Sequence, residues 1–424
     1  MLGGTLMFDN VLHQSASDLL SDDIAHDRLP GSILFSGPYA SGKLTCALEL
    51  SRVLSCRGPE YGAAQGNWSC ACPSCLKHKA LVSPSVLVVG PGNRTLEIEA
   101  AKETLLFQCY NNSRHVEASR YLYIRAVRKL TMRFNPILWQ DDDKLPKFSQ
   151  LLASIDEDLE QLEPSRALPD TAALEKCTAS IEKNCAKLES SFLYEALPVS
   201  QIRNISSWAH VSVPNGKKIL IVENADRMAD SARNALLKIL EEPPSDTMFI
   251  LTTTRRGAML PTILSRVRTY VFFERTKAQQ QEVIERVFHA VPRPGEEIPA
   301  TVERFLQHSL SVPPDTVRTA ASTFFASIAQ GHVGNLSAII SACGGFEPRM
   351  LFRLFLEGVC EAQRKLLHSP GGAMASALVM DHLHHALNSV TVYNQTPQAA
   401  LEELARNLMQ VNYMNAGVLR EAIA

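Results

Sequence analysis

The sequence predicts an α/β fold in which a parallel sheet carries a phosphate-binding loop and is followed by all-helical segments. Short apolar runs at Ser32–Ser36, Val86–Val89 and 219–222 alternate with amphipathic helical patterns, as in parallel sheets that helices cover on both faces. The first run leads directly into a G-x4-G-K segment at 37–43. Beyond Glu274 helical spacing dominates the rest of the chain.

Length and charge set the first limits on what the chain can be. At roughly 150 residues per domain, its 424 residues allow about two to four domains. Forty-two basic and 44 acidic residues give a formal net charge of −2, which excludes a protein held on nucleic acid by bulk positive charge. Any contact with DNA must therefore come from a local patch. With 46% hydrophobic and 20% charged residues, the chain is too apolar to be disordered.

The first twenty residues lack the features of an export signal. They contain Asp9 and Asp18, and they have no basic start followed by an apolar core and a small-residue cleavage site. No apolar run approaches the roughly 18 residues of a membrane span. We therefore expect a cytoplasmic protein without a membrane partner, a compartment in which clustered cysteines bind metal more often than they form disulfides.

The segment from about 93 to 195 has the pattern of a helical insertion. Amphipathic stretches run over 121–134 and 148–162, and Pro164 and Pro169 mark a break between two helical pieces. The spacing of the aromatic residues predicts core packing. The insertion also has a basic stretch, which is more typical of a solvated amphipathic helix than of a surface for DNA or a partner. That stretch consists of Arg114, Arg120, Arg125, Arg128, Lys129 and Arg133.

After the insertion, helix and strand alternate again. Strands are predicted at 219–222, 248–251 and 269–273, and the helical tail that follows is interrupted near 292–299 and 313–314.

The G-x4-G-K segment has the features of a functional phosphate loop. Gly37 and Gly42 let successive backbone N–H groups point at phosphate oxygens, and Lys43 reaches the outer phosphates. A plain tight turn is the alternative. Leu44 stands where a Ser or Thr hydroxyl should hold Mg²⁺, and Thr45 cannot substitute, because one helical residue turns the side chain away by about 100°. Nucleotide binding without hydrolysis stays open.

A second acidic site follows the strand at 219–222. Hydrolytic phosphate-loop enzymes place an Asp here for the Mg²⁺ shell and usually an adjacent Glu that orients the attacking water. This chain has Glu223 and Asn224 instead, with Asp226 close behind. An amide cannot accept a proton from water, so we do not expect this chain to hydrolyse ATP. A strand-end turn with a solvated acidic pair is the alternative.

Three runs in the second half of the sheet region carry a family resemblance. They lie at 216–228, at 234–244 with the motif Leu-Glu-Glu-Pro-Pro, and at 260–266 with Thr-Ile-Leu-Ser-Arg. In this order and spacing they resemble the bacterial clamp-loader ATPase family of AAA+ type, the gamma/tau and delta-prime subunits of DNA polymerase III. The resemblance covers roughly 1–92 and 196–275, and the insertion between them has no counterpart in it.

The resemblance implies roles for residues near the end of the sheet. Arg266, after Ser265, stands in the position of the family's arginine finger, whose guanidinium stabilises charge on the phosphoryl group in a neighbouring subunit's ATP site. Val267 replaces a common cysteine, which leaves the arginine's chemistry untouched. Thr253 or Thr254 matches the sensor position that reads the terminal phosphate. A surface arginine and a strand-end threonine without a role are the alternatives.

A finger that acts on a neighbour is thus present, while the chain's own site lacks its magnesium hydroxyl and its base. This asymmetry resembles delta-prime, which supports catalysis in the adjacent gamma/tau subunit within the DNA polymerase holoenzyme. The implied partners are the gamma/tau and delta subunits, the sliding clamp indirectly, and primer-template DNA through the assembly. Two alternatives stay open, a gamma/tau-like subunit that hydrolyses ATP itself and a phosphate-loop scaffold outside replication.

The resemblance also implies three domains. These are an AAA+ nucleotide-binding-type domain at 1–275, a small helical lid at 276–312 and a helical collar at 313–424 that joins other subunits in a hetero-oligomer.

Four of the ten cysteines stand where the family has a zinc module. Cys72 and Cys75 can bracket a tetrahedral Zn²⁺ through a tight turn, and Cys56 lies further upstream. Cys70 precedes Cys72 by only two positions, which puts their side chains on opposite sides of an extended backbone. Either the loop bends to accept Cys70, or His78 supplies the fourth ligand. A structural zinc is favoured over a set of free thiols.

Overall fold

A computed structural model describes most of the chain, namely residues 7–194, 196–211, 217–290, 299–368, 371–391, 393, 395–415 and 418–421. The chain divides into two compact units, Met1–Leu306 and Gln307–Ala424. The predicted interruption near 292–299 lies almost wholly outside the described residues.

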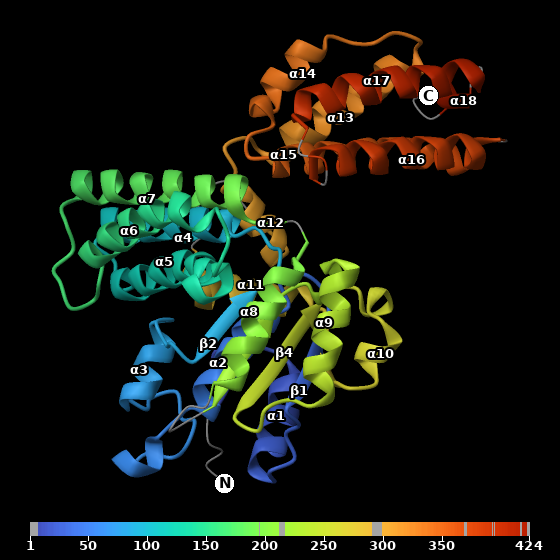
Figure 1. The fold of residues 1–424 in the computed structure, drawn as a ribbon. Coiled ribbons are helices and arrows are strands. Elements are labelled where there is room, and N and C mark those ends of the chain that lie inside the picture. The colour runs from blue at the N-terminus through green and yellow to red at the C-terminus, as the bar shows by residue number, and fades with distance from the viewer. Residues whose placement is uncertain are drawn as a thin grey trace. The chain divides into compact units, whose positions relative to one another are not determined.

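A five-stranded parallel sheet forms the centre of the first unit, in the order β2-β3-β4-β1-β5 (Figure 1). The strands are β1 Ser32–Ser36, β2 Val86–Val89, β3 Lys218–Val222, β4 Thr247–Thr253 and β5 Arg268–Val271. Leu34 of β1 lies opposite Leu251 of β4, and Ile221 of β3 lies opposite Ile250 of β4. The predicted α/β fold with a parallel sheet is therefore confirmed, although β4 runs two residues past its predicted end and β5 ends two residues before its own.

Helices cover both faces of this sheet. The helices of the first unit are α1 Ser15–Ala25, α2 Lys43–Leu54, α3 Pro73–Lys79, α4 Thr95–Tyr110, α5 Val116–Thr131, α6 Leu145–Gln161, α7 Thr171–Phe192, α8 Val199–His210, α9 Asp230–Glu241, α10 Pro261–Leu264 and α11 Lys277–Phe288, and α12 Val302–His308 crosses the boundary between the two units. Because side chains alternate along a strand, Ile33 and Phe35 pack in the core that includes α1 and α2, while Leu34 packs in the core that includes α8 and α9.

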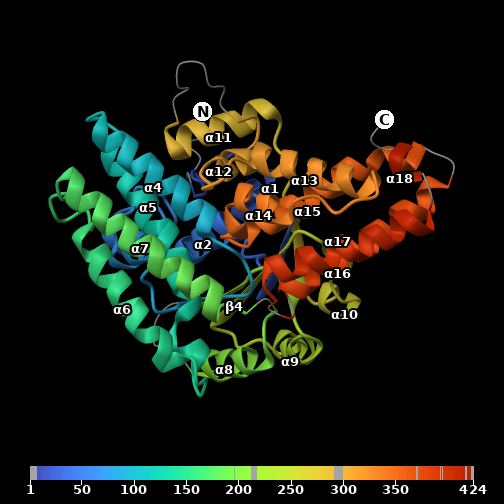
Figure 2. The same ribbon diagram turned by 90° about the horizontal axis from the view of Figure 1, so that it is seen from above.

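The insertion forms four long helices, α4 to α7, which lie side by side (Figures 1 and 2). Its buried residues, among them Tyr123, Trp139 and Phe148, belong to the same core as Leu34 of the sheet. Pro164 and Pro169 lie in the connection between α6 and α7, as predicted. The insertion is therefore packed onto one face of the sheet through a shared hydrophobic core.

The basic stretch of the insertion corrects one expectation. Arg120 is almost fully buried and donates to the backbone carbonyls of Leu162, Glu163 and Arg166. Arg128 and Lys129 pair with carboxylates of the same unit. These side chains stabilise loops and helix contacts inside the insertion, so the predicted solvated face is wrong for them, while the predicted core packing of the aromatic residues is confirmed at Tyr123 and Phe134.

Helices are the only regular secondary structure in the described residues of the second unit. Its helices are α13 Pro314–Ala329, α14 Leu336–Ala342, α15 Met350–Ala362, α16 Gly372–Thr391, α17 Pro397–Met414 and α18 Val418–Glu421. Phe324, Phe346 and Phe355 form an aromatic cluster in its core. In the parts of the chain that the structure describes, no helix has the length and apolar character needed to span a membrane. The predicted boundaries at 275/276 and 312/313 stay predictions.

Candidate functional site

The predicted phosphate loop lies between β1 and α2, and its two glycines are required by their surroundings. A Cβ on Gly37 would lie 2.3 Å from the carbonyl oxygen of Phe272. Gly42 has a φ of 94°, in the left-handed region that side chains disfavour. Strand, loop and helix N-terminus therefore have the arrangement that the sequence predicts.

Arg275, which the sequence analysis did not single out, holds the outer side of this loop. Its guanidinium donates to the backbone carbonyls of Ala40 and Ser41, both at 3.0 Å, and to that of Leu12. Burial lowers the pKa of Arg275. Arg275 follows β5 and is far from the loop in the sequence, so no local sequence pattern connects the two.

Lys43 is turned back onto its own loop. Its ammonium group donates to the carbonyls of Gly37 at 2.8 Å and Pro38 at 2.5 Å, and to the Ser41 hydroxyl at 3.2 Å. Burial lowers the pKa of Lys43 to about 8, although Glu223 acts in the opposite direction. A phosphate group at this loop would have to compete with three oxygen atoms for the same ammonium.

Leu44 contributes an apolar side chain at the magnesium-hydroxyl position. It is partly buried and packs against the core that includes α1 and α2. The described residues thus place no hydroxyl at the position of Leu44. The next residue, Thr45, lies on a different face of α2.

Glu223, at the end of β3, is enclosed by two arginines from the region of the insertion. Arg94 donates to both carboxylate oxygens, at 2.5 and 2.6 Å, and Arg133 donates to Oε2. Burial raises the pKa of Glu223, but the two guanidinium groups outweigh that effect and hold the pKa at about 2. We call Arg94, Arg133 and Glu223 the Glu223 cluster. Sequence reasoning missed both arginines, because 129 and 90 positions separate them from Glu223.

Asn224, at the predicted general-base position, uses its side chain in a hydrogen bond to the backbone. Its backbone has a φ of 48°, and its side-chain amide donates to the carbonyl of Pro91 at 2.6 Å. The amide therefore holds the connection that leads from β2 into the insertion. No carboxylate stands in the position of the general base.

Asp226 and Thr253, both singled out from the sequence, are brought together. The Thr253 hydroxyl donates to Asp226 Oδ1 at 2.7 Å, and Arg255 Nε donates to Asp226 Oδ2 at 3.0 Å. Thr253 is fully buried. These bonds connect the ends of β3 and β4, and the sensor role of Thr253 stays a prediction.

Arg266 lies on the surface after the short helix α10. It donates to Glu241 Oε1 at 2.7 Å and to the Thr262 carbonyl at 2.7 Å, and its side chain is 32% exposed. Ser265 is also exposed, and its hydroxyl donates a hydrogen bond to the Thr262 carbonyl. None of the hydrogen-bond partners of Arg266 belongs to the phosphate loop or the Glu223 cluster of the same chain.

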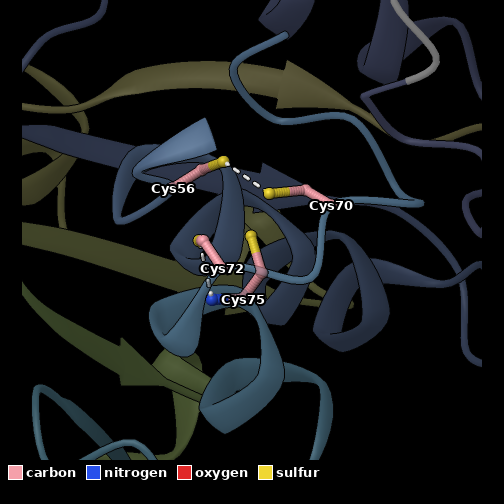
Figure 3. A group of neighbouring side chains, drawn as sticks. All are labelled: Cys56, Cys70, Cys72 and Cys75. Carbon is pink, nitrogen blue, oxygen red and sulfur yellow. Dashed lines mark hydrogen bonds between the residues drawn. The ribbon is translucent and has the colours of Figure 1, made fainter. Parts of the chain in front are cut away.

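The four cysteines form a compact buried group (Figure 3). Their sulfur atoms all lie within 4.8 Å of one another, and the Cys56 and Cys70 sulfurs are 3.8 Å apart. Zn–S bonds of about 2.3 Å at tetrahedral angles place sulfurs roughly 3.8 Å apart, so the spacing fits a zinc ion. The loop bends to bring Cys70 into the group, and His78 is not a member of it.

Hydrogen-bond donors surround these sulfurs. The backbone N–H groups of Gly58 and Cys75 donate to Cys56 and Cys72, and the buried Arg52 donates to Cys75 at 3.2 Å. Burial raises the pKa of Cys72, but backbone hydrogen bonds from Cys75 and Arg57 outweigh it and lower the pKa to about 7. Such donors stabilise thiolates, the form that binds metal.

Comparisons with known proteins agree with these features. The chain is 32% identical over 111 residues to DNA polymerase III subunit delta' of Haemophilus influenzae, covering 22% of this chain and 34% of that protein. It is 33% identical over 115 residues to the delta' subunit of Bacillus subtilis, covering 24% and 35%. A gamma/tau subunit of Mycobacterium bovis matches at 41% over 63 residues, or 15% and 11%.

The chain spans about a third of the length of the delta' relatives named first. Among solved structures, a gamma subunit-related protein of Thermotoga maritima matches with a TM-score of 0.27 and 19% identity, covering 54% of this chain and 90% of that one. A family model described as DNA polymerase III, delta subunit, matches residues 12–135 and 151–276. These residues include much of the insertion and more than half of the chain. The chain therefore belongs to this clamp-loader family of bacterial DNA polymerase III subunits.

Proposed function

We propose that this chain is a delta-prime-like subunit of the DNA polymerase III clamp loader, which supports loading of the sliding clamp during DNA replication. One observation carries the proposal: the chain keeps an exposed Arg266 in an intact Ser-Arg motif, while Leu44 and Asn224 remove the magnesium hydroxyl and the general base. An arginine that serves a neighbour must be reachable from outside, and catalysis in the same chain needs the groups that are missing.

In this proposal Arg266 is an arginine finger in trans. A guanidinium is planar and always charged, and it can stabilise charge on a transferring phosphoryl group in the adjacent subunit. The ion pair with Glu241 joins two surface side chains, and such exposed pairs contribute little stability. Arg266 can therefore exchange Glu241 for a phosphate without a large loss. The sensor role of Thr253, whose hydroxyl donates to Asp226, belongs to the same proposal.

The proposed partners are the gamma/tau and delta subunits, with the sliding clamp and primer-template DNA reached through the assembly in the cytoplasm. The helical segment 313–424 is the proposed collar that joins the subunits. We further propose that Cys56, Cys70, Cys72 and Cys75 hold a structural zinc, which their donor set and spacing fit.

The test is a loader reconstituted from gamma/tau, delta and this chain, with the ATPase rate measured in the presence of clamp and primer-template DNA. Arg266→Ala should lower the rate by about 10³-fold or more at the site that the finger serves. Arg266→Lys should restore little of it, because a lysine lacks the planar guanidinium. Lys43→Ala is the matched control and should leave the rate close to that of the unmodified loader.

A loss with Lys43→Ala as large as that with Arg266→Ala would contradict the proposal. It would favour the gamma/tau-like alternative, in which this chain hydrolyses ATP. An Arg266→Ala loader with full activity would remove the finger from the mechanism. Failure of the chain to assemble with the other subunits would favour a role outside replication.

A further inference from the structure

The Glu223 cluster joins the region of the insertion to the acidic end of β3. We propose that the guanidinium groups of Arg94 and Arg133 take, at Glu223, the place of the magnesium ion of hydrolytic phosphate-loop proteins, so that this chain's site excludes Mg²⁺-nucleotide. The inference concerns the isolated chain, and it holds whether or not the chain works in clamp loading.

The first support is that both oxygens of the Glu223 carboxylate already accept hydrogen bonds from guanidinium groups. Arg94 donates to both carboxylate oxygens of Glu223, and Arg133 donates a further hydrogen bond to Oε2. The Arg133 side chain is 1% exposed and that of Glu223 is 10% exposed. Mg²⁺ needs a near-octahedral oxygen shell and usually keeps several waters. The residues around Glu223 therefore do not fit this ion.

The second support is the balance of charge. Arg94 also pairs with Glu97 at 3.2 Å, and Glu97 pairs with Lys129. Glu189 accepts from the backbone N–H of Arg94 and from the Thr95 hydroxyl. Arg94, Arg133 and Lys129 thus already compensate the charges of Glu223 and Glu97 without a metal ion. A divalent ion would bring two uncompensated charges into a buried site, which is costly.

The third support is that the rest of the fold holds both arginines in place. Arg133 also donates to the Gly92 carbonyl, and its own carbonyl accepts from the Trp139 indole at 2.8 Å. A Cβ on Gly92 would lie 2.9 Å from the Arg133 guanidinium. Asn224 holds the neighbouring Pro91 carbonyl. Several independent contacts thus fix the position of the cluster, which makes it a permanent replacement for the ion.

The experiment measures binding of a fluorescent ATP analogue to the isolated full-length chain, with Mg²⁺ and with EDTA. Mg²⁺ should not tighten binding to the unmodified chain, nor to Leu44→Thr, which restores only the hydroxyl. In the triple variant Leu44→Thr/Arg94→Gln/Arg133→Gln, Mg²⁺ should tighten binding by about tenfold or more. The matched control Leu44→Thr/Arg120→Gln also loses a buried arginine of the insertion, but one that does not contact Glu223, and it should show no Mg²⁺ effect.

Tenfold tighter binding with Mg²⁺ in the unmodified chain or in Leu44→Thr would overturn the proposal, as would a folded triple variant that ignores Mg²⁺. Thermal unfolding checks that the triple variant folds.

A second measurement needs no variant: electron paramagnetic resonance of Mn²⁺ with ATP and the unmodified chain should show no signal beyond that of Mn²⁺-ATP in buffer. A protein-bound Mn²⁺ signal would contradict the proposal. The Arg266 experiment reads the partner's ATPase, so either test can fail without the other.

Discussion

At the scale of single residues, Glu223 shows how strongly two neighbours can set the state of a buried carboxylate. An isolated buried carboxylate would take up a proton, because burial disfavours the charged form. Arg94 and Arg133 reverse this outcome, and the pKa falls to about 2. Removing one partner of such a group usually costs more than the pair contributes, because a charge stays buried without compensation.

This arrangement predicts a specific loss of stability in acid. The folded-state pKa of Glu223 is lowered, so its contribution is fully present above the ordinary pKa of about 4.5 and disappears as the pH falls toward 2. We expect the difference in unfolding free energy between the unmodified chain and Glu223→Gln to shrink by an amount on the order of 3 kcal/mol across this window. Urea unfolding at a series of pH values measures it.

The control for this prediction is Glu241→Gln, which removes an exposed carboxylate paired with Arg266. Its stability should follow the unmodified chain through the same pH window, because exposed pairs contribute little. A constant difference between Glu223→Gln and the unmodified chain from pH 5 to 2 would show that Glu223 is not held ionised by its arginines.

At the scale of elements, the segment between α2 and β2 is organised around its four clustered cysteines. Cys72 caps the N-terminus of α3 and Pro73 occupies the first helical position, where its missing N–H costs nothing. Arg52 of α2 donates to Cys75 and to the carbonyls of Gly66 and Asn67. The buried Arg52 therefore connects α2, which packs against the sheet, to the cysteine-bearing loop, which has little apolar core of its own.

We expect the purified chain to contain about one zinc per molecule. Cys70→Ser should lose most of it, because Cys70 lies in the group of four cysteines that is proposed to hold the ion. His78→Ala should retain it, since His78 lies outside the group. Elemental analysis of the three proteins gives the ratios directly. Zinc loss in His78→Ala together with retention in Cys70→Ser would reverse the ligand assignment, and absence of metal from the unmodified chain would remove the proposal.

At the scale of the whole molecule, the insertion and the sheet share one hydrophobic core. Phe148 of α6 is fully buried and contacts Phe134, Trp139 and Phe192. The same core continues to the strand residues Leu220 and Phe249. Loss of packing in the insertion is therefore transmitted to the sheet.

Phe148→Ala should destabilise the first unit by about 3–5 kcal/mol, the usual cost of removing a buried phenylalanine ring. Hydrogen exchange followed by mass spectrometry should then show faster exchange in β3 and β4 as well as in α5 and α6. Phe107→Ala, on the 38%-exposed side chain of α4, is the control and should change little. Unchanged protection in β3 and β4 would mean that the insertion unfolds by itself.

The local patterns of the sequence were sufficient for the strands, the phosphate loop, the helical insertion and the surface motif that ends in Arg266. Each of these depends on residues within a few positions of one another, such as a four-residue apolar run or the spacing G-x4-G-K. Composition alone already excluded a protein held on DNA by net charge.

Only the tertiary structure decided the contacts of the acidic site and the grouping of Cys70, rather than His78, with the other three cysteines. Arg94, Arg133 and Arg275 contact residues 90 to 263 positions away, and these contacts follow no period and no motif. The basic stretch likewise has the composition of a solvated face, but its Arg120 is buried and donates to the backbone carbonyls of Leu162 and Arg166. Sequence records which side chains are available, whereas the packing of distant segments determines which charges meet.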